Sequence, residues 1–216
     1  MPSLIELGTL TDLDVLATEM RRRIEARGFA EPKAFLKMTE QILVDHPSVR
    51  ALVLPAGTVI DGDLHLDYDG LDSRIGTIAA LGDLEVKGRI VNADSDGGPF
   101  FLADGNVVAR QIVMGGASFV VLGSVKSAGV VFCDYNHGTF LVGGDVAAPA
   151  LITNDQMVEV AGAITGLVIG DDEGNMRDLL VAEVFEDPDD PDDQWPDGDL
   201  MRERLATGLP VLKSGW

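Results

Sequence analysis

The segment "FCDYNHGTF", residues 132–140, places a thiol, a carboxylate, a phenol and an imidazole within five positions. Such groups can serve as nucleophile, general base and proton donor when they converge beside donors for an oxyanion. No such donors can be placed near Cys133, and a Cys among apolar residues is an inert small hydrophobe. We therefore predict no catalytic residue and an interior Cys133. Asp134, Tyr135 and His137 are predicted to lie at the surface as partner contacts.

The loop "NADSDGG" at 92–98 is a candidate calcium site. Asn92, Asp94 and Asp96 match the first ligand positions of an EF-type loop, but Ala103 stands where the bidentate Glu belongs. We interpret the segment as an inserted surface loop and keep calcium as the alternative. The three histidines fall at unrelated positions of the repeat described next, so a zinc site of several His is not expected. No cofactor is predicted.

A repeat in the middle of the chain must position these segments. Apolar residues lie four and two positions before a recurring glycine and two after it, and a small, mostly polar residue follows it directly. This period of two is typical of strands with one buried face, and the small polar residue suggests a bend that needs a positive φ, or a bulge. A further apolar column eight after the glycine contains Ile90, Val113, Val131 and Ile152. The recurring glycines are Gly62, Gly82, Gly105, Gly123, Gly144 and Gly162.

Coils of this kind predict a mainly β fold, a single-stranded β-helix with about six coils of roughly 20 residues over 57–170. We expect it to be right-handed, with Phe101, Phe119 and Phe140 stacked inside it. An antiparallel sandwich or barrel is the alternative, but it does not require columns to keep register.

The two flanking regions differ from the repeat. Residues 1–56 are predicted to be a helical cap with helices at 11–28 and 31–44, and 171–216 an acidic extension with a short helix from Asp199. We expect both regions to cover the ends of the tube.

The charge of −20 is unevenly distributed, since residues 171–216 hold 14 acids and 4 bases. Such a surface repels nucleic acid and anionic lipid and attracts basic proteins. The segment "EDPDDPDDQWPDGD" is interpreted as a partner-binding loop in which an aromatic anchor sits among carboxylates. Packing of Trp195 back on the tube is the alternative left open. Without a signal-peptide pattern or a membrane-length apolar run, we expect a cytoplasmic protein. The predicted contacts in this loop are Asp189, Asp190, Asp192, Asp193 and Trp195.

The G-[D/N/S]-[L/V]-x-[V/A] coil resembles the bactofilin and polymer-forming family of bacterial β-helices over about residues 57–170. That resemblance implies a self-assembling scaffold, although bactofilins lack structured regions at both ends. The overall layout is also similar, more loosely, to β-helix proteins encoded beside bacterial polymorphic toxins, some of them presumed immunity proteins.

The sequence therefore predicts an acidic protein-binding module, an immunity-type inhibitor that occludes a basic bacterial toxin domain. Two alternatives remain open. One is a bactofilin-like scaffold that forms homo-oligomers, and the other is a β-helix enzyme or metal-binding protein.

Overall fold

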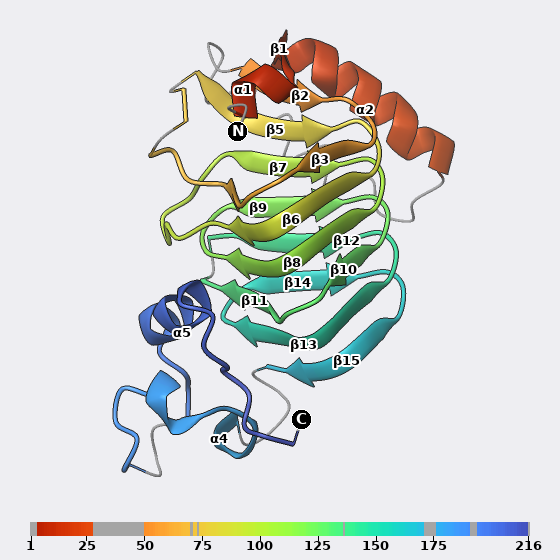
Figure 1. Ribbon diagram of the computed structural model, residues 1–216. Coiled ribbons are helices and arrows are strands. Elements are labelled where there is room, and N and C mark those ends of the chain that lie inside the picture. Colours follow the sequence, from red (N-terminus) through yellow and green to blue (C-terminus); the bar gives the residue numbers. More distant parts are fainter. Residues whose placement is uncertain are drawn as a thin grey trace.

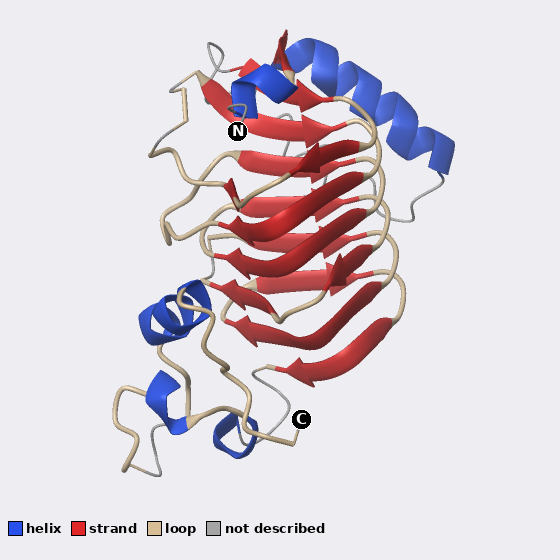
Figure 2. Ribbon diagram, in the orientation of Figure 1, coloured by secondary structure: helices blue, strands red, loops and turns tan. Residues whose placement is uncertain are grey.

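The chain forms a β-solenoid of about six turns, seen in a computed structural model that describes residues 4–27, 50–69, 71–72, 74–135, 137–170, 176–190 and 194–215 (Figure 1). The fold is mainly β, as predicted. Successive turns pair in parallel around one axis, so that strands of the middle turns meet their counterparts one turn before and after (Figure 2). The predicted helix at 31–44 lies outside the described residues.

The strands form two sheets that face each other across the core. The seven-stranded sheet has the order β1 (Thr9–Asp12), β2 (Arg50–Leu54), β5 (Ile75–Ala80), β7 (Phe100–Ala103), β9 (Ser118–Val121), β12 (Thr139–Val142) and β14 (Met157–Val160). The eight-stranded sheet contains β3 (Thr58–Ile60), β4 (Leu64–His65), β6 (Leu84–Val91), β8 (Val107–Met114), β10 (Val125–Ser127), β11 (Val131–Asp134), β13 (Val146–Asn154) and β15 (Ile164–Ile169).

Stacked identical positions build the core between these sheets. The rings of Phe101 and Phe119 stack with centroids 4.6 Å apart, and those of Phe119 and Phe140 with centroids 5.1 Å apart. All three are fully buried, which confirms the predicted aromatic ladder. The ladder spans the middle turns, and aliphatic side chains continue its column toward both ends. In register order the column is Leu52, Ile78, Phe101, Phe119, Phe140 and Val158.

The recurring glycines are required by close backbone approach between turns. A Cβ on Gly123 would lie 2.5 Å from the Gly105 carbonyl oxygen, and one on Gly162 would lie 2.6 Å from the Gly144 oxygen. Of the recurring glycines that the structure describes, only Gly82 has a φ in the positive range. The predicted positive φ is therefore wrong as a general reason, and steric exclusion of a side chain replaces it.

The small polar residue after each glycine has a related role: its side chain accepts a backbone N–H from the next turn. Because the side chain is short, its oxygen reaches the neighbouring turn without disturbing the strand ladder. The bonds run from Asn106 N to Asp83 Oδ1 (2.7 Å), Ser124 N to Asn106 Oδ1 (2.9 Å), Asp145 N to Ser124 Oγ (3.0 Å) and Ala163 N to Asp145 Oδ1 (2.8 Å).

The register of the first turn differs from the prediction. Strand β2 begins the solenoid at Arg50, before the predicted start at 57, and Ala56 lies where later turns have glycine, since a Cβ on Gly82 would meet it. Thr58 pairs with Leu84, so Gly62 belongs to a different column from the other glycines.

The apolar column eight residues after the glycine was also partly misassigned. Val131 pairs with Ile112 and Leu151 inside the tube. Val113 and Ile152 point outward instead. The register shifts between β6 and β8 and between β13 and β15 displace, by one residue, the alternation of inward and outward side chains along these strands.

The N-terminal region closes one end of the solenoid. Strand β1 pairs antiparallel with β2 along the sheet edge, and Leu4 and Leu7 of helix α1 (Leu4–Leu7) pack on the core. Helix α2 (Leu13–Arg27) confirms the predicted first helix and packs on the outer face of the seven-stranded sheet.

The C-terminal extension packs mainly on a flank. Its apolar side chains cover the outer face of the eight-stranded sheet around Phe132, Ile152 and Ile169. Figure 1 shows α5 beside β11, with the rest of the extension continuing past β15. The expectation that it covers the far end of the tube is wrong, because its apolar residues pack against the outward apolar side chains of this sheet instead. Its helices are α4 (Met176–Leu179), the 3-10 helix η1 (Ala182–Val184) and α5 (Gly198–Ala206).

Candidate partner-binding surface

Cys133 lies inside the solenoid, as predicted. Its side chain is fully buried in the core, where it pairs in register with Met114 and Thr153. Burial raises the pKa of the thiol far above its usual value, because the thiolate would lose its hydration. A thiol held in this state does not supply a nucleophile.

Asp134 is buried, and its predicted exposure is wrong. The residue is 4% exposed, and its carboxylate forms an ion pair with Arg202 and accepts a 2.8 Å hydrogen bond from Asn154. Burial raises the pKa of this carboxyl group, although the positive charge of Arg202 offsets part of the shift. Gly198, at the start of α5, has no room for a Cβ beside this carboxylate. Asp134 therefore attaches the C-terminal extension to the solenoid.

Tyr135 and His137 remain at the surface. Their rings meet edge to face with centroids 5.0 Å apart, and Tyr135 is 39% exposed. Tyr135 adopts a φ of 85°, an uncommon value for a non-glycine residue, which turns the chain sharply after β11. Among the described residues of 132–140, this pair is exposed and a partner can reach it.

The predicted acidic loop in the extension is partly described. Asp189 and Asp190 are exposed, and Trp195 is 50% exposed, so its ring is not packed into the core. Asp192 and Asp193 lie outside the described residues. Arg177 donates hydrogen bonds to the carbonyl oxygens of Asp187 (2.7 Å) and Pro188 (2.9 Å), which hold the start of the loop against α4.

The candidate calcium loop has a structural role at Asn92. This side chain is fully buried, donates to the Leu66 and Gly97 carbonyl oxygens, and accepts the Ala117 N–H at 2.7 Å. It therefore links three neighbouring turns. Among the described residues, no three His, Cys, Asp or Glu side chains are grouped to hold a metal.

A cavity of about 220 Å³ lies beneath α1 at the closed end. Leu4, Leu7 and Leu71 line it together with β3 and β4, and its acidic neighbours Asp61 and Asp63 pair with Lys87 and Arg89. These contacts leave the described lining mainly apolar, and they account for both carboxylates as surface ion pairs.

The opposite end of the solenoid is the most distinctive surface, and we call β14 and β15 the terminal coil. Its inward residues are accessible: Ile164 is 38% exposed, and Val158, Val160 and Val168 are half-buried. Their counterparts one turn earlier are at most 3% exposed. In register order these counterparts are Phe140, Val142, Val146 and Leu151.

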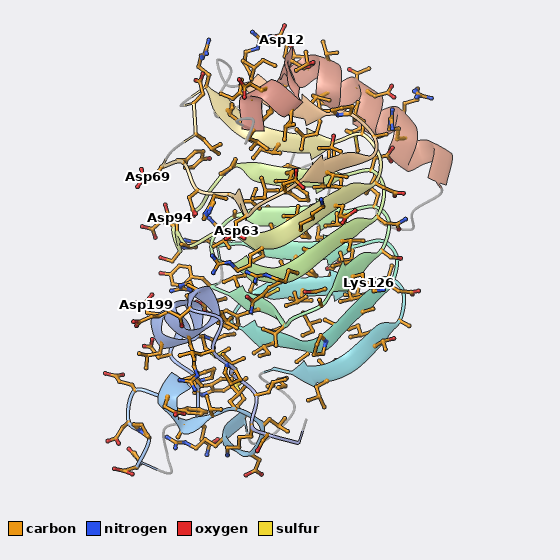
Figure 3. All side chains as sticks on the ribbon, in the orientation of Figure 1. Asp12, Asp63, Asp69, Asp94, Lys126 and Asp199 are labelled. Atoms are coloured by element: carbon orange, nitrogen blue, oxygen red, sulfur yellow. The ribbon has the colours of Figure 1, made fainter. Side chains whose placement is uncertain are left out.

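Charge distinguishes this end further. No Lys or Arg occurs between Lys126 and Arg177, whereas Asp145, Asp155 and Glu159 are all exposed there. Figure 3 shows further acidic groups on one side of the solenoid, with Asp69 and Asp94 toward the closed end and Asp199 on α5. The terminal coil is thus an apolar surface in a region with no basic side chain of its own.

The sequence reasoning missed the terminal coil as a site. The absence of basic residues over the last turns was a signal that could have drawn attention to it. Its exposure was not predictable, because that depends on where the C-terminal extension packs.

No family model, no curated protein and no solved structure matches this chain. In the described part of the chain, no helix combines the length and the apolar character needed to span a membrane. The fold therefore defines the class, a β-solenoid closed at one end, and its surfaces are the basis for a functional proposal.

Proposed function

We propose that this protein is an acidic protein-binding module, and that it works as an immunity-type inhibitor by covering a basic bacterial toxin domain in the cytoplasm. The observation that carries this proposal is the accessible apolar terminal coil in a stretch without Lys or Arg. Binding rather than catalysis is favoured by the buried thiol of Cys133 and by the pairing of Asp134 with Arg202.

Two steps follow from the charge and the apolar surface. Exposed carboxylates such as Asp155, Glu159 and Asp189 attract a basic domain over distances near the Debye length, about 8–10 Å at physiological salt. The apolar terminal coil then supplies the desolvated centre of the contact. Long-range attraction raises the association rate, whereas the apolar contact governs how long the complex lasts.

The test is co-expression with a basic toxin domain encoded by a neighbouring gene, and a neighbourhood without such a gene would count against the proposal. Cells that carry both should survive, and the affinity should fall as ionic strength rises. A variant with Asp155→Lys and Glu159→Lys should lose protection, whereas the matched pair Asp12→Lys and Asp14→Lys near the closed end should keep it. Failure of the native, folded protein to protect cells or to bind the domain would contradict the proposal.

A bactofilin-like scaffold is the second candidate, and the open edges of β14 and β15 favour it. Exposed edges and an apolar end face are the features through which β-solenoids can associate with further copies. Sedimentation over a wide concentration range distinguishes the two functions. A scaffold gives assemblies that grow with concentration, and an inhibitor gives a species of constant mass.

A further inference from the structure

The free edge of β15 is suited to receive one more strand. Strand β15 pairs with β13, and β14 pairs with β12, and neither has a second partner among the described strands. The Val146 N–H bonds to the Ala163 carbonyl oxygen at 2.9 Å. Because backbone groups alternate in direction along a strand, the N–H and C=O of Ile164 face the free side.

Of the two edges, β15 is the better template. It has six residues, ITGLVI, and no charged side chain, whereas the four-residue β14 contains Glu159. Natural sheets protect exposed edges with charges, Pro or bulges. Strand β15 has neither a charge nor a Pro, and its one irregularity is at Gly166, which has a φ of 124° opposite the register shift in β13. An added strand would also cover the inward residues Ile164 and Val168.

The polar ladder argues against a further coil of the same kind at this end. In the preceding turns, Asp83, Asn106, Ser124 or Asp145 accepts an N–H from the next turn, but the terminal coil has Ala163 at this position. Without such an acceptor, the bend of another coil would lack a hydrogen bond that four successive turns make. A single extended strand needs no such bend.

Charge indicates which kind of strand can bind at the free edge of β15. A second copy docked by its own terminal coil would bring its Asp145, Asp155 and Glu159 to the junction, and these like charges would repel. The other end of such a copy is already covered by β1 and α1. A strand that contains Lys or Arg would instead be attracted by the three carboxylates, which lie in β14 and at the two ends of β13 rather than in β15 itself.

Resting on the proposed inhibitor function, we propose that β15 binds an extended segment of the partner in which apolar and basic residues alternate. The segment adds as an edge strand, and its apolar side chains cover the core. Its basic side chains point away from the core and are attracted by Asp145, Asp155 and Glu159. Main-chain hydrogen bonds supply the affinity and the alternation supplies the selectivity.

The probe is a seven-residue peptide in which Val and Lys alternate. Its controls are a peptide of the same composition with Val and Lys in blocks, and a peptide in which Val alternates with Glu. NMR titration of the full chain should shift the amides of 164–169 with the alternating Val–Lys peptide and slow their exchange. Binding should weaken with salt.

Two matched pairs of variants locate the contact. Ile164→Lys should lower the affinity for the alternating Val–Lys peptide about tenfold, because it places a charge on the edge. Val108→Lys should leave the affinity unchanged, since Val108 is similarly exposed, at 42%, but belongs to β8. Likewise Glu159→Lys should weaken binding and Glu85→Lys should not. Because all four sites are exposed, far-ultraviolet circular dichroism should confirm that each variant folds.

Three results would overturn the inference. They are amide shifts outside the terminal coil, equal binding of the Val–Glu peptide, and a native dimer that Ile164→Lys dissociates, which would make a second copy the occupant. The toxin domain separates this inference from the proposed function. If that domain binds the native protein and Ile164→Lys equally, only the strand inference fails, whereas absence of binding to the native protein contradicts the function itself.

Discussion

The two ends of the solenoid have the same kind of core, but one end is covered by added elements and the other is left accessible. At the closed end, β1 pairs along the edge of β2 and α1 places Leu4 and Leu7 over the apolar interior. At the other end, β14 and β15 each have a neighbour on one side among the described strands. The same inward column is fully buried at Leu52 and half-buried at Val158.

This difference shows that closure is not a property of the repeat. Each turn presents an apolar face, and an added element must cover the last one. The extension from Met176 onward has enough apolar residues to do so, yet it covers Phe132, Ile152 and Ile169 on the flank instead. The terminal coil is therefore left accessible, although the chain contains material that could cover it.

The largest expected effect compares one column at the two ends. Leu52→Ala should lower the free energy of unfolding by about 2–5 kcal/mol, because it leaves a cavity in a closed core. Val158→Ala should cost about 1 kcal/mol or less, since its side chain already contacts solvent. Urea unfolding measures both values. Equal losses would mean that the far end is as well covered as the near one.

A smaller effect is expected where the extension is attached. Arg202→Ala leaves the Asp134 carboxylate buried without its cation and should cost about 2 kcal/mol. This value is below the roughly 3–5 kcal/mol of fully buried pairs because the Arg202 side chain is 16% exposed. The double variant Asp134→Leu with Arg202→Met should recover most of the loss, as measured by thermal unfolding. Hydrogen exchange in β14 should stay unchanged in both proteins, and faster exchange there would show that the extension covers the end.

The smallest effect concerns α2, beside the closed end. Hydrogen bonds from Arg22 and Arg23 lower the pKa of Glu19 to about 2 from its usual 4.5. A lowered pKa stabilises the fold above pH 4.5, and this contribution disappears as the pH falls through about 2. Glu19→Gln should therefore melt slightly below the native protein at pH 6 and together with it below pH 2.

Salt provides the control for Glu19, because the pair is exposed and its attraction is screened. The difference in melting temperature at pH 6 should shrink in high salt. A difference that persists below pH 2 would show that packing, rather than charge, links Glu19 to α2.

The repeated part of the fold could be predicted because local rules determine it. Phe101, Phe119 and Phe140 share one offset from their glycines, and stacking requires such a column to lie together. The first turn was missed because Ala56 takes the position of glycine there. The direction of the Val113 side chain was misassigned because the register shift between β6 and β8 displaces the inward–outward alternation by one residue.

The candidate site depended on contacts that no local rule gives. Asp134 is buried by Arg202, which lies 68 residues away in the sequence. Its neighbours Tyr135 and His137 stayed exposed, although all three were predicted from the same turn. The accessibility of Ile164 likewise follows from the packing of the extension on Phe132 rather than from the terminal coil itself.

Hydrogen exchange of the native protein, with and without a basic toxin domain that it binds, is the most direct test of the terminal coil as the binding surface. We expect slower exchange over 157–169 in the complex and no change over Leu4–Leu7 or Thr9–Asp12. Protection at the closed end or on the outer face of β6 and β8, with 157–169 unchanged, would contradict it.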